Sequence, residues 1–418
     1  MDILTIITLL IFISAAFSYL NERFVKLPGT IGVITISVLV SVAILVAGKF
    51  GKSFGAPIKT LTESIDFSKV LLDVMLGFLL FASALHFDYK KLRAQRRPVL
   101  VLSTVGVLIS TGIFGGLLYM ASALIGVHIP FIYCLVFGSL ISPTDPIAVS
   151  AILKKTKIPP RLETIISGES LFNDAVGLIL FVTLLGLAET SEAAFSWSHT
   201  LEHFGQEVLG GILLGLAMGY IGHRLIHSIR DFQTILLISV SIVLGVSSIA
   251  QLIHASVPLG VVAAGLVVGN KTFSENHPAG EYLVNTWRLL DEVLNTILFV
   301  MIGLQLVVLP FLEHYWLMGI MSIAIVLVAR FSSILLPVLP KIRKENMGSL
   351  GILTWAGLRG GISVAMALSL PESDYREVIL ASCYFIVIFS IIVQGLTLDK
   401  VIKAAMKGKP AMEEDEPY

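Results

Sequence analysis

The sequence predicts an all-helical polytopic membrane protein with 13 transmembrane helices. Of its 418 residues, 56% are hydrophobic and 14% are charged, whereas an average soluble domain carries roughly 25% charged residues. The apolar residues gather in runs long enough to span a bilayer, and the basic residues gather in alternate loops between those runs. Because 29 Lys and Arg balance 29 Asp and Glu, a soluble protein this apolar would be expected to aggregate. A bilayer is therefore the natural solvent for this chain.

The runs are counted against the bilayer core, which needs about 20 mostly apolar residues per helix. In chain order the 13 runs are 3–20, 29–48, 67–87, 98–125, 130–153, 162–187, 204–228, 232–253, 256–270, 281–309, 315–340, 347–370 and 376–399. The first run follows Met1-Asp2 without a basic segment, so it is interpreted as a retained helix and not as a signal peptide. The ninth is short and starts near Pro258, which predicts a bent helix or one sheltered by its neighbours.

The orientation follows from the distribution of basic residues, because cytoplasmic loops carry an excess of Lys and Arg. With 13 spans, 21 of the 29 basic residues fall in loops on one side and 4 fall in loops on the other. The N-terminus is therefore predicted outside and the C-terminus in the cytoplasm. We expect a multi-pass protein of the plasma membrane, most simply a bacterial inner membrane.

Five ionisable residues fall in the middle of predicted spans, where a charge costs about 2.5–3.5 kcal/mol even on lenient insertion scales. They are Asp145, Glu169, Asp174, Arg330 and Arg359. Charges at this depth usually mark ion or substrate pathways, and the alternative is a paired structural ion bridge.

Two spans carry sequences that interrupt a helix. The fifth contains Ser142-Pro143-Thr144-Asp145-Pro146, whose prolines lack amide donors and push the preceding residues out of the helical conformation. The twelfth contains three glycines within Gly357–Gly361, on either side of Arg359, and glycine weakens a helix. The fifth and twelfth spans are separated by seven positions in the order of spans. Because successive spans cross the membrane in opposite directions, these two run in opposite directions, as in an inverted repeat. Such a pair indicates a transporter ion site at the membrane midplane.

The sixth span supplies oxygen ligands. Ser170 and Asp174 are four residues apart and share one helical face, while Glu169 and Asn173 share the face beside it. A carboxylate with a hydroxyl one turn away suits a hard monovalent cation, and no thiolate or histidine pair nearby favours a transition metal.

The charge balance of the five residues indicates the transport mode. Three acids and two bases leave the cluster at −1 when all are ionised, and an unpaired charge in the membrane is unfavourable. One proton or one monovalent cation restores neutrality. Burial disfavours the ionised form of a carboxyl group, so Asp174 is expected to exchange protons near neutral pH. Competition of a proton and a cation for one carboxylate is antiport, provided that the five residues converge.

Together these motifs resemble the cation/proton antiporters of the CPA1 type, the bacterial NhaP branch. The matching sequences are Ser142–Pro146, Gly168-Glu-Ser-Leu-Phe-Asn-Asp174 and Gly357-Leu-Arg-Gly-Gly361. The resemblance implies discontinuous helices 5 and 12 that cross at the midplane, and a homodimer. It also implies a division of each protomer. The expected parts are a dimerisation domain of helices 1–3 and 7–10 (residues 1–97 and 204–309), a core of helices 4–6 and 11–13 (98–203 and 315–403), and a short cytoplasmic tail (404–418).

The resemblance also implies roles for individual residues. Asp174 would be the carboxylate shared by cation and proton, and Thr144, Glu169 and Ser170 would help to coordinate a sodium ion with it. Asn173 would help to hold Glu169, and Arg330 would bridge to Glu169. Asp145 and Arg359 would balance the charges of the unwound stretches. In this family the Asn173-Asp174 pair goes with electroneutral exchange of one cation for one proton.

The expected function is exchange of Na⁺, and also Li⁺, for H⁺ by alternating access, in support of cytoplasmic pH and salt homeostasis. The ligand types do not separate these ions from K⁺, so K⁺/H⁺ exchange stays open. A cation channel is a distant alternative, because it would need a continuous polar pathway and the charged cluster here is compact and internally compensated. An intramembrane hydrolase using Asp145 and Asp174 would need a nucleophile motif or a gating loop, and the sequence contains neither. We expect membrane lipid as a partner, and neither a cofactor, an enzymatic activity nor a nucleic acid partner.

Overall fold

The computed structural model of this chain describes residues 3–49, 60–62, 66–145, 149, 158–189, 197–274, 280–308, 315–338 and 347–406. Within these ranges the backbone forms helices joined by turns, without a strand. Ten of the described helical segments are long and apolar enough to cross a membrane. Large apolar side chains such as Phe12, Leu124 and Leu252 lie more than two-thirds exposed on the outer surface, which is expected where lipid replaces water. The chain is therefore a multi-pass, all-helical membrane protein.

The 13 predicted spans are confirmed in part, since ten meet the length and composition of a full crossing. The three others are short or interrupted. Helix α9 covers Phe131–Ile141, α14 covers Val257–Ser274, and the twelfth run is divided into α17 (Met347–Trp355) and α18 (Gly361–Leu368). Two of these three runs are the ones in which proline or glycine predicted an interruption.

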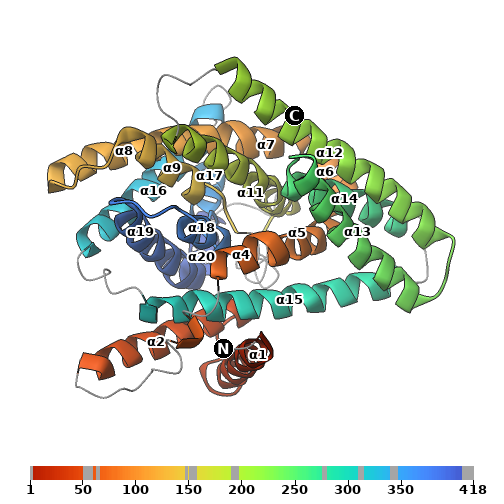
Figure 1. The fold of residues 1–418 in the computed structure, drawn as a ribbon, viewed down its shortest axis with the longest axis horizontal. Coiled ribbons are helices and arrows are strands. Elements are labelled where there is room, and N and C mark those ends of the chain that lie inside the picture. Colours follow the sequence, from red (N-terminus) through yellow and green to blue (C-terminus); the bar gives the residue numbers. More distant parts are fainter. Residues whose placement is uncertain are drawn as a thin grey trace.

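One group of helices packs along α15 (Gly280–Gln305), which runs across the molecule in Figure 1. Helices α1 (Ile3–Leu20) and α2 (Gly29–Lys49) lie along one side of it. The hydroxyl groups of Ser37 and Ser41 on α2 donate to backbone carbonyls of α15 at 3.0 and 2.7 Å. On the other side, α15 packs against α5 (Leu76–Leu85), which continues the short α4 (Phe67–Lys69) and a π-helical segment, Val70–Met75.

On the far side of α5 lie α14 and α13 (Phe232–Leu252), and α12 (Trp197–His227) packs against both of these helices. Helices α12 and α14 approach closely because Gly211, Gly215 and Gly219 recur every four residues on the contact face. A Cβ atom at any of these positions would collide with the backbone of α14 or of Ser256, the residue before it. Small residues at such spacing let membrane helices pack backbone to backbone. This contact shelters the short α14, as its sequence predicted.

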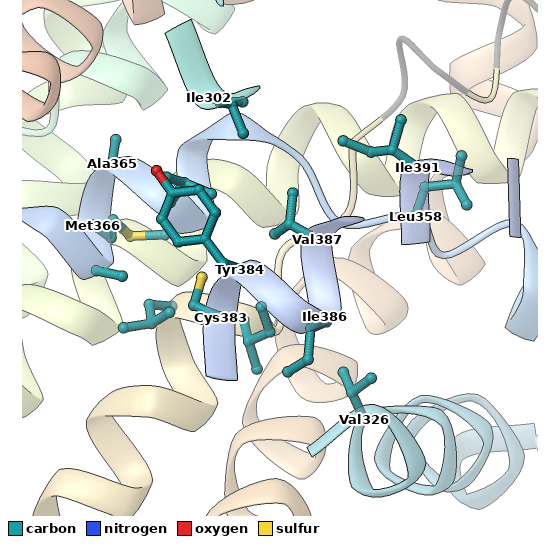
Figure 2. Close-up of a cluster of buried hydrophobic side chains, with 14 of the residues drawn as sticks. Ile302, Val326, Leu358, Ala365, Met366, Cys383, Tyr384, Ile386, Val387 and Ile391 are labelled. Carbon is teal, nitrogen blue, oxygen red and sulfur yellow. The ribbon is translucent and has the colours of Figure 1, made fainter. Parts of the chain in front are cut away.

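The remaining helices form a second group, most of which lie above or to the left of α5 in Figure 1. In chain order they are α6 (Tyr89–Ala94), α7 (Arg96–Val101), α8 (Val107–Ile125), α9, α11 (Pro160–Glu189), α16 (Trp316–Val338), α17, α18, α19 (Arg376–Ile388) and α20 (Gly395–Met406). Figure 2 shows the packing of this group around α19. There Tyr384 lies beside Met366 of α18, and Ile386 lies near Val326 of α16. All four side chains are buried.

Several sequence-based expectations fall partly outside the described residues. These are Pro146 and the second half of the fifth run, much of the loop from Glu189 to His203, and residues 407–418 of the tail. Many of the basic residues that predict the orientation lie there as well, including Lys154, Lys155 and Lys157.

Candidate functional site

Two non-helical segments, each interrupting a membrane helix, meet at the centre of the second helix group. Helix α9 ends at Ile141, and residues 142–145 continue without helical structure. Helix α17 ends at Trp355, and α18 begins at Gly361 after a non-helical link. The Asp145 N–H donates to the carbonyl of Leu358 at 2.7 Å. The predicted interruptions are therefore present, and the two extended segments are hydrogen-bonded to each other.

Arg359 provides positive charge at the end of α9. Its Nη1 donates to the carbonyl oxygens of Ser142 and, at 2.9 Å, Pro143. The last carbonyls of a helix have no partners within the helix and carry the negative end of its dipole. The buried guanidinium of Arg359 therefore compensates the C-terminal end of α9.

Asp145 has the complementary position at the start of α18. A Cβ atom added to Gly360, the residue that precedes α18, would collide with the Asp145 carboxylate. The N-terminus of a helix carries partial positive charge and free N–H groups, so it favours a nearby carboxylate. The glycine at position 360 is what allows the carboxylate to approach this closely.

Helix α11 presents a polar face to the 142–145 segment. The hydroxyl groups of Thr144 and Ser170 lie 2.9 Å apart. Asn173 donates from Nδ2 to Thr144 Oγ1 at 2.8 Å and accepts from the Thr144 N–H at 3.3 Å. The family resemblance implied that Asn173 holds Glu169, but both ends of its amide bond Thr144 instead. Glu169 lies one turn away on the same helix, and its carboxylate accepts from Arg330 of α16.

Glu169 and Arg330 form a buried ion pair between α11 and α16. Arg330 donates from Nη1 to Oε1 and from Nη2 to Oε2, the second bond being 2.9 Å long. Nη2 also donates to the carbonyl of Leu353 on α17 at 3.3 Å. The planar guanidinium fork matches a carboxylate in this two-bond arrangement. Arg330 therefore joins three helices through one side chain.

Asp174 lies in a cavity of about 30 Å³ with Asp145. A buried water needs roughly 10–15 Å³ on the same measure, so the cavity has room for a small ion or a water. Its wall includes α5 and α15 on one side, through residues such as Leu76 and Leu298, and α11 and the start of α18 on the other. The cavity thus lies where the two helix groups meet.

The five mid-span charges predicted from the sequence are all buried, at 1–8% exposure. Among the residues that the structure describes, they are the only buried acids and bases of the types Asp, Glu, Lys and Arg. The resulting cluster contains three carboxylates and two guanidinium groups. It has an excess of one negative charge when all are ionised, which a monovalent cation or a proton can compensate.

Sequence reasoning missed some residues that support the site. Ser390 accepts from the Arg359 N–H at 2.8 Å and donates to Gln394 Oε1 at 2.7 Å, which fixes the 356–360 link from the π-helical segment Phe389–Gln394. Ser110 and Thr111 of α8 lie 3.0 and 3.3 Å from the Ser142 hydroxyl. A polar residue within an apolar run is the only signal that marks them.

Known proteins match this chain over most of its length. A family model described as "Sodium/hydrogen exchanger, transmembrane" matches residues 6–404. The Na⁺/H⁺ antiporter NhaP of Pseudomonas aeruginosa is 38% identical over 419 residues, which cover 97% of this chain and 98% of that protein. The Na⁺/H⁺ antiporter NhaH of Halobacillus aidingensis is 31% identical over 350 residues, which cover 82% and 85% of the two chains.

A solved structure shares the fold. It is that of the sodium proton antiporter MjNhaP1 from Methanocaldococcus jannaschii at pH 8, with a TM-score of 0.77. The match covers 98% of this chain and 100% of that one, at 18% sequence identity. Two chains this different in sequence therefore adopt the same helical architecture.

Proposed function

This chain belongs to the sodium/hydrogen exchanger family, and we propose that it exchanges Na⁺ for H⁺ across the membrane at Asp174. It is a secondary transporter and not an enzyme. The relatives named above are Na⁺/H⁺ antiporters, which favours sodium over potassium as the exchanged cation. The resemblance to the NhaP branch is thereby confirmed.

The observation that carries the proposal is the Asp174 carboxylate in the cavity, for which the described part of the chain provides no ion pair. Glu169 is paired with Arg330, and Arg359 and Asp145 compensate the ends of α9 and α18. Asp174 remains as the carboxylate that a mobile ion must neutralise, because a buried, unpaired charge is unfavourable. Since one proton or one Na⁺ satisfies the same charge, the two compete, and exchange is electroneutral at one to one.

The neighbouring oxygen atoms provide a ligand set for the cation. We assign Thr144, Ser170 and Glu169 to Na⁺ together with Asp174, because hydroxyl and carboxylate oxygens suit a hard ion. The Thr144 and Ser170 hydroxyls are adjacent, and Asn173 orients Thr144. Both oxygens of Glu169 already accept from Arg330, so Glu169 would share one of them with the ion. Li⁺ fits the same ligand chemistry.

The architecture supports transport by alternating access. We propose 13 membrane helices, with the extended segments of helices 5 and 12 crossing at the midplane of an inverted repeat. Helices α1, α2, α5 and α12–α15 form the dimerisation domain of a homodimer, and α8, α9, α11 and α16–α20 form the moving core. The cavity at their junction opens to one side or the other as the core moves. The distribution of basic residues favours an outside N-terminus and a cytoplasmic C-terminus in the plasma membrane.

The test uses purified protein in proteoliposomes with an internal pH-sensitive dye. Addition of Na⁺ should dissipate an imposed pH gradient, Li⁺ should act similarly, and K⁺ should have little effect. Asp174→Asn should abolish the response, because an amide neither binds a proton nor carries the compensating charge. Asp399→Asn, at an exposed surface pair with Lys403, is the matched control and should transport like the wild type. Full activity of Asp174→Asn would refute the proposal, and a strong response to membrane potential would refute the stoichiometry.

A further inference from the structure

A second cavity, of about 380 Å³, lies on the other face of α11, beside the junction of α6 and α7. Leu92, Arg93, Arg96, Val99, Leu100 and Phe172 line it. Its volume falls within the range of small-molecule sites, roughly 300–1,000 Å³. The ion exchange described above uses none of these residues.

The wall of this cavity is amphipathic. Arg93 and Arg96 are exposed, and neither has an ion pair among the residues that the structure describes. They belong to a cluster of five basic residues within eight positions, Lys90 to Arg97. The nearest acid in the sequence, Asp88, accepts from the N–H groups of Lys90 and Lys91 at the start of α6. Two adjacent guanidinium groups are therefore available for an anion.

The apolar side of the cavity continues onto the lipid-facing surface. Leu100 follows Arg96 by one helical turn and is 52% exposed, and Leu108 lies two turns further along and is 55% exposed. Beneath them, the Val99 side chain packs against Gly168 of α11. An apolar path therefore leads from the two arginines along the outer surface of α7 and α8.

We propose that this cavity binds an anionic phospholipid. The phosphate would lie between Arg93 and Arg96, because guanidinium groups bind phosphate through two hydrogen bonds. An acyl chain would lie over Leu100 and Leu108. Basic pockets between membrane helices recognise lipid head groups in this way. The site is independent of ion exchange at Asp174.

The test is native mass spectrometry of the purified full chain in detergent with added phosphatidylglycerol. Arg93→Gln/Arg96→Gln should weaken binding of the tightest lipid by about tenfold or more, since the loss of even one charged hydrogen bond contributes about a factor of ten. Lys90→Gln/Lys91→Gln removes the same charge outside the cavity and should leave this binding unchanged. Equal loss in both variants would overturn the proposal.

Two further measurements separate a lipid from a free anion and do not depend on the double arginine variant. Phosphatidylcholine should bind at least tenfold more weakly than phosphatidylglycerol, and inorganic phosphate should not displace the lipid. Leu100→Gln, at an exposed position, should weaken lipid retention through the acyl chain. Displacement by phosphate, or unchanged lipid retention in Leu100→Gln, would overturn the lipid assignment.

Discussion

The Glu169–Arg330 pair offers a quantitative test of how the core is stabilised. We consider Arg330→Met, which retains an apolar stem and removes the guanidinium group. The Glu169 side chain is 1% exposed, so its carboxylate would remain buried without its cationic partner. Its two hydrogen bonds from Arg330 would both be lost, together with the bond from Arg330 to the Leu353 carbonyl.

The expected loss of stability follows from these contacts. Hydrogen bonds to charged groups contribute about 1.5–3 kcal/mol each, so two of them amount to roughly 3–6 kcal/mol. Removal of one partner of a buried ion pair destabilises proteins by about 3–5 kcal/mol. We therefore expect Arg330→Met to lower the free energy of unfolding by about 3–5 kcal/mol.

The assay is unfolding in mixed detergent micelles, followed by circular dichroism, with a double-mutant cycle. Arg330→Met/Glu169→Leu removes both charges, and it should recover most of the lost stability because no unpaired charge remains. A double variant that is as unstable as Arg330→Met would refute the reasoning, since loss of packing and not of charge pairing would then dominate.

Two glycine substitutions test close approaches in the site and in the fold. Gly360→Ala places a methyl group against the Asp145 carboxylate. In the dye assay it should lower the transport rate by at least about tenfold, equivalent to 1.4 kcal/mol. The control Gly351→Ala, whose methyl group meets open space, should transport normally. Gly215→Ala forces α12 away from the backbone of α14 and should destabilise the protein by about 1–3 kcal/mol. Gly112→Ala, also in open space, should be neutral in the same unfolding measurement, and equal stability of the two variants would contradict the packing argument.

Local sequence chemistry was sufficient to predict the interruptions in two helices. Proline removes a backbone donor and fixes its own φ angle wherever it occurs, so the end of α9 before Pro143 does not depend on the rest of the fold. The buried charges were equally predictable, because a mid-span Arg330 or Asp174 has no access to water. These properties belong to the residues themselves, so they do not depend on how the helices pack.

Contacts between helices were not predictable, because they depend on helix rotation. The Asn173 amide can reach Thr144 on the neighbouring segment or Glu169 one turn away on its own helix, and the sequence spacing alone does not choose between the two partners. The π-helical segments, such as Phe389–Gln394, also had no signal in the sequence. Within that segment, Ser390 accepts a hydrogen bond from the Arg359 N–H of the 356–360 link. Helix length alone does not identify α9 and α14 as complete crossings.

Competition of Na⁺ and H⁺ for Asp174 is tested most directly by the pH dependence of the half-saturating Na⁺ concentration, measured by initial ²²Na⁺ uptake into proteoliposomes. At pH values low enough for most of Asp174 to be protonated, little of the form that binds Na⁺ remains. The half-saturating concentration should therefore rise about tenfold for each unit by which the pH falls. The maximal rate at saturating Na⁺ should stay constant across that range. A half-saturating concentration that does not change with pH, combined with a falling maximal rate, would show that the two ions bind at different groups and would contradict exchange through one carboxylate.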